Sequence, residues 1–135
     1  SPDNSARYTP YVLLLERVDL RQLAATYRQL YPMLQTAYEE LGYPKLYFND
    51  RLVEVLDQLI ATPVVDGPIR VRKPVIHGPV QPARPWVLYE FEDPALQALT
   101  AGQRIMVRVG PVNERRLKGR LSELRRLLAT GTPNQ

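Results

Sequence analysis

The chain of 135 residues has the length of one domain, and its 44% hydrophobic and 24% charged residues are typical of a globular protein. It has no cysteine and a single histidine, which excludes disulfides, thiolate zinc sites and cysteine nucleophiles. Its formal charge of +4 comes from residues 101–135, which hold eight basic and two acidic residues.

The first nine residues are polar, and we predict a flexible tail or linker end there. One globular domain is expected over residues 10–130, followed by a second flexible tail at 131–135. Thr9 and Pro10 can serve as the cap and first position of a helix. Residues 11–18 form a short apolar run that fits a helix or a strand, and its lack of β-branched character favours a helix.

Residues 19–41 show a strong helical period, with apolar residues at steps of three and four. Asp19 is the expected N-cap, and Gln22 can complete a capping box. Pro32 lies inside this pattern, so we expect a kink or a restart of the helix nearby. Gly42 then provides a left-handed C-cap.

A second helix is predicted after Asn49, which is a good N-cap residue, and it should end at Thr62 because Pro63 follows. Leu56 belongs to its apolar face. The connection between the two helices, residues 41–49, is short and rich in tyrosine. Such a connection favours two helices that pack roughly antiparallel.

The next part of the chain, residues 63–85, is rich in proline. Residues 69–72 alternate apolar and charged side chains and predict a short strand, while residues 86–91 are the strongest strand candidate. The two strands are expected to pair across an extended, proline-spaced loop at residues 75–84.

Three more helices are predicted near the C-terminus. Asp93 and Pro94 can start a short one, and Thr100 with Gln103 favours a helix over a strand for residues 101–109. The last helix should span residues 111–129 with a buried leucine stripe at positions 117, 121, 124 and 128. The predicted fold class is therefore mainly α with a small two-stranded β element (α+β), in a single compact helical domain.

Basic residues dominate the last two predicted helices, and the leucine stripe suggests that they point outward. They are Arg104, Arg108, Arg115, Arg116, Lys118, Arg120, Arg125 and Arg126. Such a surface can bind anionic lipid headgroups or nucleic acid, although ordinary solvation of a helix explains it as well. No aromatic residue is interleaved with them, so specific nucleic-acid binding is not expected.

Tyrosines cluster around the two helices of residues 19–62, and Tyr43 and Tyr47 are the candidates for a protein interface. The alternative is that these rings fill the core. Asp50, Glu54 and Asp57 share a helix face that can hold a cation or support acid–base chemistry, but a solvated face is the simpler reading. We expect no enzyme activity, cofactor or metal.

Four segments carry a resemblance to a known family: YPMLQTAYEELGYP, YFNDRLVEVLDQLIATP, WVLYEFEDPALQALTAGQR and VGPVNERRLKGRLSELRRLL. Together they resemble an uncharacterised family of Gram-negative bacterial proteins, a domain of unknown function, over about residues 8–130. Members of that family typically have one N-terminal transmembrane helix, a proline-rich linker and this domain outside the membrane.

The resemblance implies that Ser1 begins a soluble fragment of an anchored envelope protein. The domain would then lie at the periplasmic face of the inner membrane, and in the cytoplasm if there is no anchor. The leading hypothesis is a non-catalytic interaction or scaffolding domain with a protein partner in the envelope. The alternatives are a nucleic-acid-binding protein that uses the basic C-terminal helices, and an unrecognised enzyme with carboxylate chemistry.

Overall fold

Helices make up most of the part of the chain that the computed structural model describes, which is residues 2–67, 69–72 and 90–129. The elements are α1 (Pro2–Glu16), α2 (Leu20–Glu40), α3 (Phe48–Ile60), β1 (Val71–Arg72), β2 (Glu90–Phe91), α4 (Pro94–Gln97), α5 (Ala101–Arg108) and α6 (Pro111–Ala129). The predicted mainly α fold with a two-stranded β element is confirmed. None of these described helices is long and apolar enough to cross a membrane.

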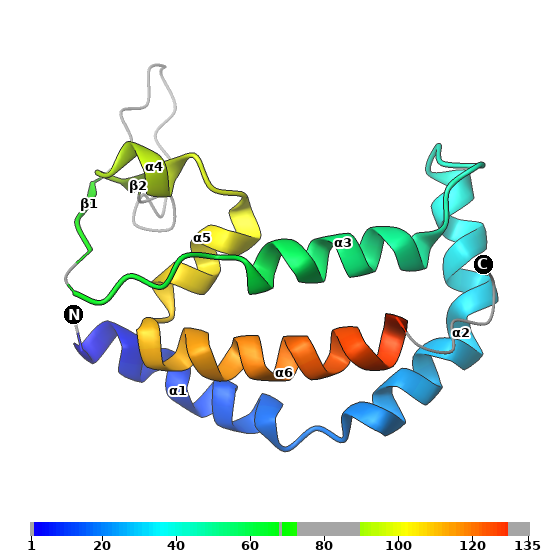
Figure 1. Ribbon diagram of the computed structural model, residues 1–135, viewed down its shortest axis with the longest axis horizontal. Coiled ribbons are helices and arrows are strands. Elements are labelled where there is room, and N and C mark those ends of the chain that lie inside the picture. The colour runs from blue at the N-terminus through cyan, green and yellow to red at the C-terminus, as the bar shows by residue number, and fades with distance from the viewer. Residues whose placement is uncertain (1, 68, 73–89, 130–135) are drawn as a thin grey trace, which may run out of the picture.

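Helix α6 is the centre of the fold, because α1, α2, α3 and α5 all pack on it. Helix α1 runs alongside α6 in the same direction, and α3 runs alongside it in the opposite direction (Figure 1). Ala24, Leu56 and Leu128 form the buried core between α2, α3 and α6, with Leu121 and Leu124 packed against it. Three residues of the predicted leucine stripe of α6, at positions 121, 124 and 128, therefore face this core.

The predicted antiparallel pairing of α2 with α3 is wrong. Helix α3 lies along α6, and the C-terminal part of α2 crosses the N-terminal end of α3 (Figure 1). The leucine stripe of α6 offers α3 an apolar line of matching length. An ion pair between Asp57 of α3 and Arg125 of α6, 2.7 Å apart, lies on the same seam.

The predicted tail at residues 1–9 is also corrected, since residues 2–9 belong to α1 and Pro10 lies inside that helix. Asn4 donates a hydrogen bond to the backbone oxygen of Arg108, and Asn113 donates one to the backbone oxygen of Ser5. Helix α1 packs so closely on the turn between α5 and α6 that a Cβ at Gly110 would collide with Ser5. These contacts with distant residues stabilise a segment that looks loose by composition.

Helix α2 continues through Pro32 as a single bent helix, so the proline bends it without a restart (Figure 1). Thr36 donates its hydroxyl to the backbone oxygen of Pro32. Asp19 caps the N-terminus as predicted, by accepting bonds from the amides of Arg21 and Gln22.

The predicted strand pair is confirmed over its described residues. Strands β1 and β2 are antiparallel, with Val71 opposite Phe91 and Arg72 opposite Glu90. Asp93 caps α4, and the predicted capping box of Thr100 and Gln103 starts α5. The predicted loop at 75–84, the first residues of the second predicted strand and the predicted tail at 131–135 lie outside the described residues.

The core position of Leu56 gives the first prediction. Leu56 is 4% exposed, so Leu56→Ala should lower the free energy of unfolding by about 2–5 kcal/mol through lost burial and a cavity. Leu41, which is 78% exposed, provides the control, and Leu41→Ala should change stability by less than about 0.5 kcal/mol. Urea unfolding of the variants beside the wild type measures both. Equal effects of the two substitutions would contradict the packing of α3.

Candidate functional site

A surface hollow of about 370 Å³ lies where the end of α2, the following turn and the start of α3 meet. Aromatic and acidic side chains dominate its lining. The lining residues are Tyr38, Tyr43, Leu46, Tyr47, Asp50, Arg51 and Glu54. Tyr43 and Tyr47, the candidates for a protein interface, are thus brought together at one site with carboxylates of α3.

The turn after α2 places the ring of Tyr43 against that of Tyr38. Gly42 has a φ of 115°, a left-handed conformation that glycine adopts without a steric penalty, and it reverses the chain. The ring of Tyr43 returns over that of Tyr38, with the centroids 4.7 Å apart and the planes nearly parallel. Tyr38 also meets the edge of Phe48 at 5.6 Å, so one wall of the hollow is fixed by packing.

Gln35 holds the rest of the turn. Its Nε2 donates to the backbone oxygen of Leu46 at 2.8 Å, and its Oε1 accepts from the amide of Phe48 at 2.7 Å. The buried Tyr31 donates its hydroxyl to the same Oε1 and accepts from the amide of Asn49. Side chains of α2 therefore satisfy the first amides of α3, which would otherwise lack partners.

These bonds explain why the predicted N-cap of α3 is wrong. The helix begins at Phe48, and Asn49 is buried inside it. The Oδ1 of Asn49 accepts from the hydroxyl of Tyr27 at 2.9 Å, and its Nδ2 donates to the backbone oxygen of Leu128. Burial, together with the neighbouring Tyr31, raises the pKa of Tyr27 to about 12, so its hydroxyl is a stable donor.

The predicted carboxylate face of α3 is divided by the structure. Asp50 and Glu54 line the hollow, and Glu54 forms an exposed ion pair with Arg51 at 3.0 Å. Asp57 instead pairs with Arg125 of α6, which raises the pKa of that arginine. The described residues contain no group of three histidine, cysteine or acidic side chains that could hold a metal ion. The hollow therefore combines aromatic walls with two carboxylates.

Most of the basic residues predicted to form an anionic-binding surface contact other parts of the protein. Arg115 pairs with Asp66 at 2.9 Å, and Arg116 pairs with Glu16 at 3.2 Å. The guanidinium of Arg108 lies 5.1 Å from the ring centroid of Phe91.

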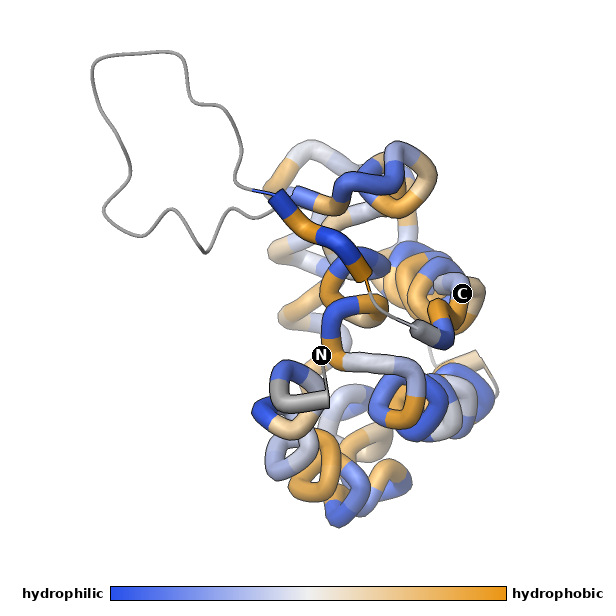
Figure 2. The backbone as a smooth tube through the Cα atoms, turned by 90° about the vertical axis from the view of Figure 1, so that its left-hand side faces the viewer, coloured by the Kyte–Doolittle hydropathy of each residue, from blue (hydrophilic) through white to orange (hydrophobic). Residues whose placement is uncertain are grey.

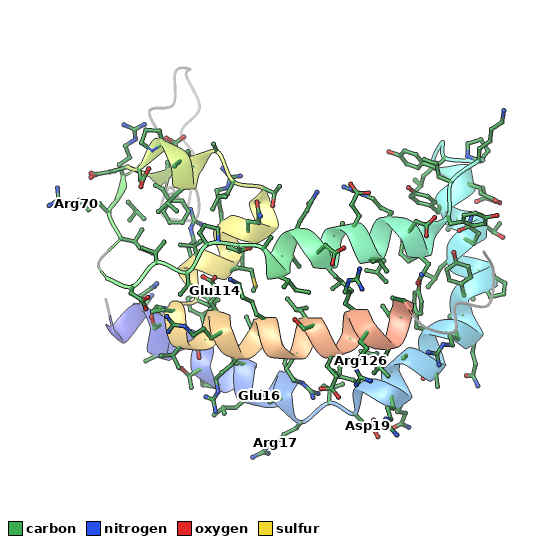
Figure 3. The ribbon with its side chains drawn as sticks, in the orientation of Figure 1. Glu16, Arg17, Asp19, Arg70, Glu114 and Arg126 are labelled. Atoms are coloured by element: carbon green, nitrogen blue, oxygen red, sulfur yellow. The ribbon has the colours of Figure 1, made fainter. Side chains whose placement is uncertain are left out.

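Arg104 donates to the backbone oxygen of Gln97. Arg126 is exposed on α6 (Figure 3). The contacts of these arginines leave less cationic surface for lipid or nucleic acid than the charge count predicts.

The basic side chains of the last helix were predicted to point outward, and this is wrong for Lys118 and Arg120. Lys118 is largely buried and donates to the backbone oxygen of Thr62, just beyond the end of α3. Arg120 donates to the backbone oxygen of Val18, just beyond the end of α1. Both cations thus fix neighbouring segments to α6.

Sequence analysis did not single out Glu114, which the structure shows to be a buried charged residue. It is buried on α6 (Figure 3), and its Oε2 lies 3.0 Å from the Nζ of Lys118. Burial raises the pKa of Glu114, although the nearby Lys118 and Arg115 offset part of the rise. The spacing of Glu114 and Lys118 by four residues is a sequence signal for the pair, but it does not reveal that the pair is buried.

Comparison with known proteins identifies a family for this fold. A family model described as "Protein of unknown function (DUF3014)" matches residues 1–125. The chain belongs to this family. No curated protein matches the chain, and no solved structure matches it either. Membership of this family names no activity, so the function has to be inferred from the site itself.

The raised pKa of Glu114 predicts a pH dependence of stability. A carboxyl whose pKa is higher in the folded state stabilises the fold below its unfolded pKa, and this contribution is lost as the pH rises through the folded value. Glu114→Gln removes the titration. The variant should therefore gain stability relative to the wild type as the pH rises from about 4 to about 7.

Urea unfolding across that pH range measures the difference between the two proteins. Glu92→Gln is the matched control, because Glu92 is an exposed carboxyl just after β2. A difference between Glu114→Gln and the wild type that stays constant with pH would show that burial does not perturb this group.

Proposed function

We propose that this chain is a non-catalytic protein-interaction domain, and that the hollow between α2 and α3 binds a basic side chain of a partner polypeptide. The observation that carries the proposal is the meeting of three tyrosines with Asp50 and Glu54 around one opening. Tyrosine rings attract cations through their faces, and carboxylates attract them by charge. An arginine or lysine side chain satisfies both parts of this lining.

The rigidity of the hollow supports binding. Tyr38 is held between Tyr43 and Phe48, and Gln35 fixes the backbone on both sides of Tyr47. Side chains that are already ordered lose less conformational freedom when a partner binds. Tyr43 and Tyr47 remain about half exposed, so their rings are accessible to a partner.

The exposure of the lining also favours binding over catalysis. A general acid or base acts with a shifted pKa in a site that excludes water, whereas Asp50 and Glu54 are exposed to solvent. The ion pair of Glu54 with Arg51 is similarly open to water. A partner cation can replace Arg51 at little cost, because exposed ion pairs contribute little free energy.

We further infer that the domain acts as an interaction or scaffolding part of a membrane-anchored envelope protein, with its partner in the envelope. The support for this is the likeness of its four characteristic segments to a family whose members typically carry an N-terminal transmembrane helix. The full-length gene provides the direct check, because an upstream transmembrane segment is expected.

The proposal predicts selective binding of basic peptides. In an NMR titration, acetyl-Gly-Arg-Gly-amide should shift the amide signals of residues 43–54, and acetyl-Gly-Glu-Gly-amide should not. Replacement of Tyr43 and Tyr47 by alanine should weaken this binding by about five- to thirtyfold, the loss expected when cation–π contacts worth about 1–2 kcal/mol are removed.

Ile105→Ala is the control, because it removes an exposed apolar side chain on α5 and should leave the affinity unchanged. Asp50→Asn with Glu54→Gln separates the contribution of charge from that of the rings. Equal binding of the two peptides, or signal changes away from the hollow, would contradict the proposal.

A further inference from the structure

The outer face of α2 bears no charge over most of its length. From residue 22 to residue 37 every exposed side chain is uncharged: Gln22, Leu23, Ala25, Thr26, Gln29, Leu30, Pro32, Met33, Thr36 and Ala37. The one charged residue in this span, Arg28, is half-buried and donates to the backbone oxygen of Leu127. A helix face on a protein surface ordinarily carries charged residues, so a stretch of this length without them needs an explanation.

The exposed apolar residues of this face follow the spacing of a helix–helix seam. Leu23, Leu30, Met33 and Ala37 lie on positions that alternate by three and four residues, with Thr26 filling the remaining position. This is the pattern by which one helix packs against another. Met33 is 67% exposed. The residues that α2 buries in this protein, such as Ala24, lie on a different side of the helix.

Helix α1 carries a similar line of exposed residues, formed by Tyr11 and Leu14 and continued by Val18 just beyond its end. Tyr11 is 68% exposed and Leu14 is 63% exposed, while Val12 on the inner side is buried. Helices α1 and α2 follow one another along the lower edge of the molecule (Figure 1), and Figure 2 shows hydrophobic positions in orange along that edge.

At 100° per residue, both lines are rotated in the same sense and by a similar angle from the buried side of their helices. We call the two lines together the α1–α2 strip.

The two ends of the α1–α2 strip carry opposite charges. Arg7 is exposed one turn before Tyr11 on the same line, and Glu40 is exposed three residues after Ala37. A second copy of the chain that lies antiparallel on the strip places Arg7 of each copy next to Glu40 of the other. In this arrangement the uncharged stretch of residues 22–37 of each copy lies against the line of Tyr11, Leu14 and Val18 of the other, as a twofold interface requires.

We propose that the protein forms a twofold homodimer in which the α1–α2 strips of two copies pack antiparallel. This assignment is independent of the hollow between α2 and α3. An anionic bilayer fits the strip less well, because Glu39 and Glu40 lie at one end of it.

Sedimentation across a concentration series tests the dimer. The wild type should associate reversibly, and Leu30→Glu should raise the dimer dissociation constant by about tenfold or more, because it buries a charge twice. Ile105→Glu is the matched control, since Ile105 is an exposed apolar residue on α5 and its variant should associate like the wild type. Arg7→Glu and Glu40→Arg should each weaken association, and their combination should restore it.

Cysteine cross-linking tests the antiparallel arrangement, because the chain has no cysteine of its own. Leu23 lies near the middle of the strip, so Leu23→Cys should form a disulfide-linked dimer. Met33 lies ten residues further along α2, about 15 Å at 1.5 Å per residue, so two copies of Met33→Cys are about 30 Å apart and should not cross-link. Leu14→Cys combined with Met33→Cys should cross-link, because these positions lie at similar distances on either side of the middle.

A monomer at all concentrations would overturn the proposal. Cross-linking of Met33→Cys alone would overturn the antiparallel arrangement, since only a parallel pair brings those positions together. Binding of a monomer to phosphatidylglycerol vesicles, lost in Leu30→Glu, would assign the strip to a membrane instead. Circular dichroism of each variant shows whether the fold is retained, and the Ile105→Glu control separates loss of association from a general effect of the added charge.

Discussion

The fold depends on the need of helix ends for hydrogen-bond partners. The last carbonyl groups of a helix have no amide partner within the helix, and they cost free energy when they are buried without one. In this protein, side chains from other helices donate to carbonyls in the last turn of a helix or just beyond its end. The pairs are Arg120 with Val18, Lys118 with Thr62, Gln103 with Gln58, Asn4 with Arg108, and Arg28 with Leu127. Each of these bonds joins residues that are distant in sequence, so they position the helices as well as ending them.

This constraint explains which features of the fold could be predicted from the sequence. Caps formed by neighbouring residues, such as Asp19, Asp93 and the pair of Thr100 and Gln103, were predicted correctly because the donor and acceptor are close in the chain. The helical state of residues 2–9 was missed, since its support comes from Asn113 more than one hundred residues away. The predicted pairing of α2 with α3 failed for the same reason, because α6 competes for the apolar face of α3.

The charged residues were the least predictable part of the candidate site. A lysine on an amphipathic helix is ordinarily a solvated residue. The four-residue spacing of Glu114 and Lys118 indicates an ion pair, but it does not reveal that Lys118 is largely buried. Tyrosines concentrate near the turn in the sequence, and the structure brings Tyr43 and Tyr47 to the lining of one hollow. The sequence did not show that these rings would meet Asp50, since that requires the chain reversal at Gly42 and the bonds of Gln35.

Helix α2 links the two surfaces that we assign to binding. Its inner side chains, Tyr31 and Gln35, accept hydrogen bonds from the first amides of α3 and so shape the hollow. The outer side nevertheless bears no charge and exposes several apolar residues, although solvent-exposed positions of a helix are free to become charged without loss of the fold. A strip of this kind on a small domain indicates a contact with another molecule. Because a twofold pair carries two hollows, a partner with repeated basic side chains can occupy both, and the second contact then forms at a raised effective concentration. Weak binding at each exposed hollow is therefore compatible with firm attachment of the whole assembly.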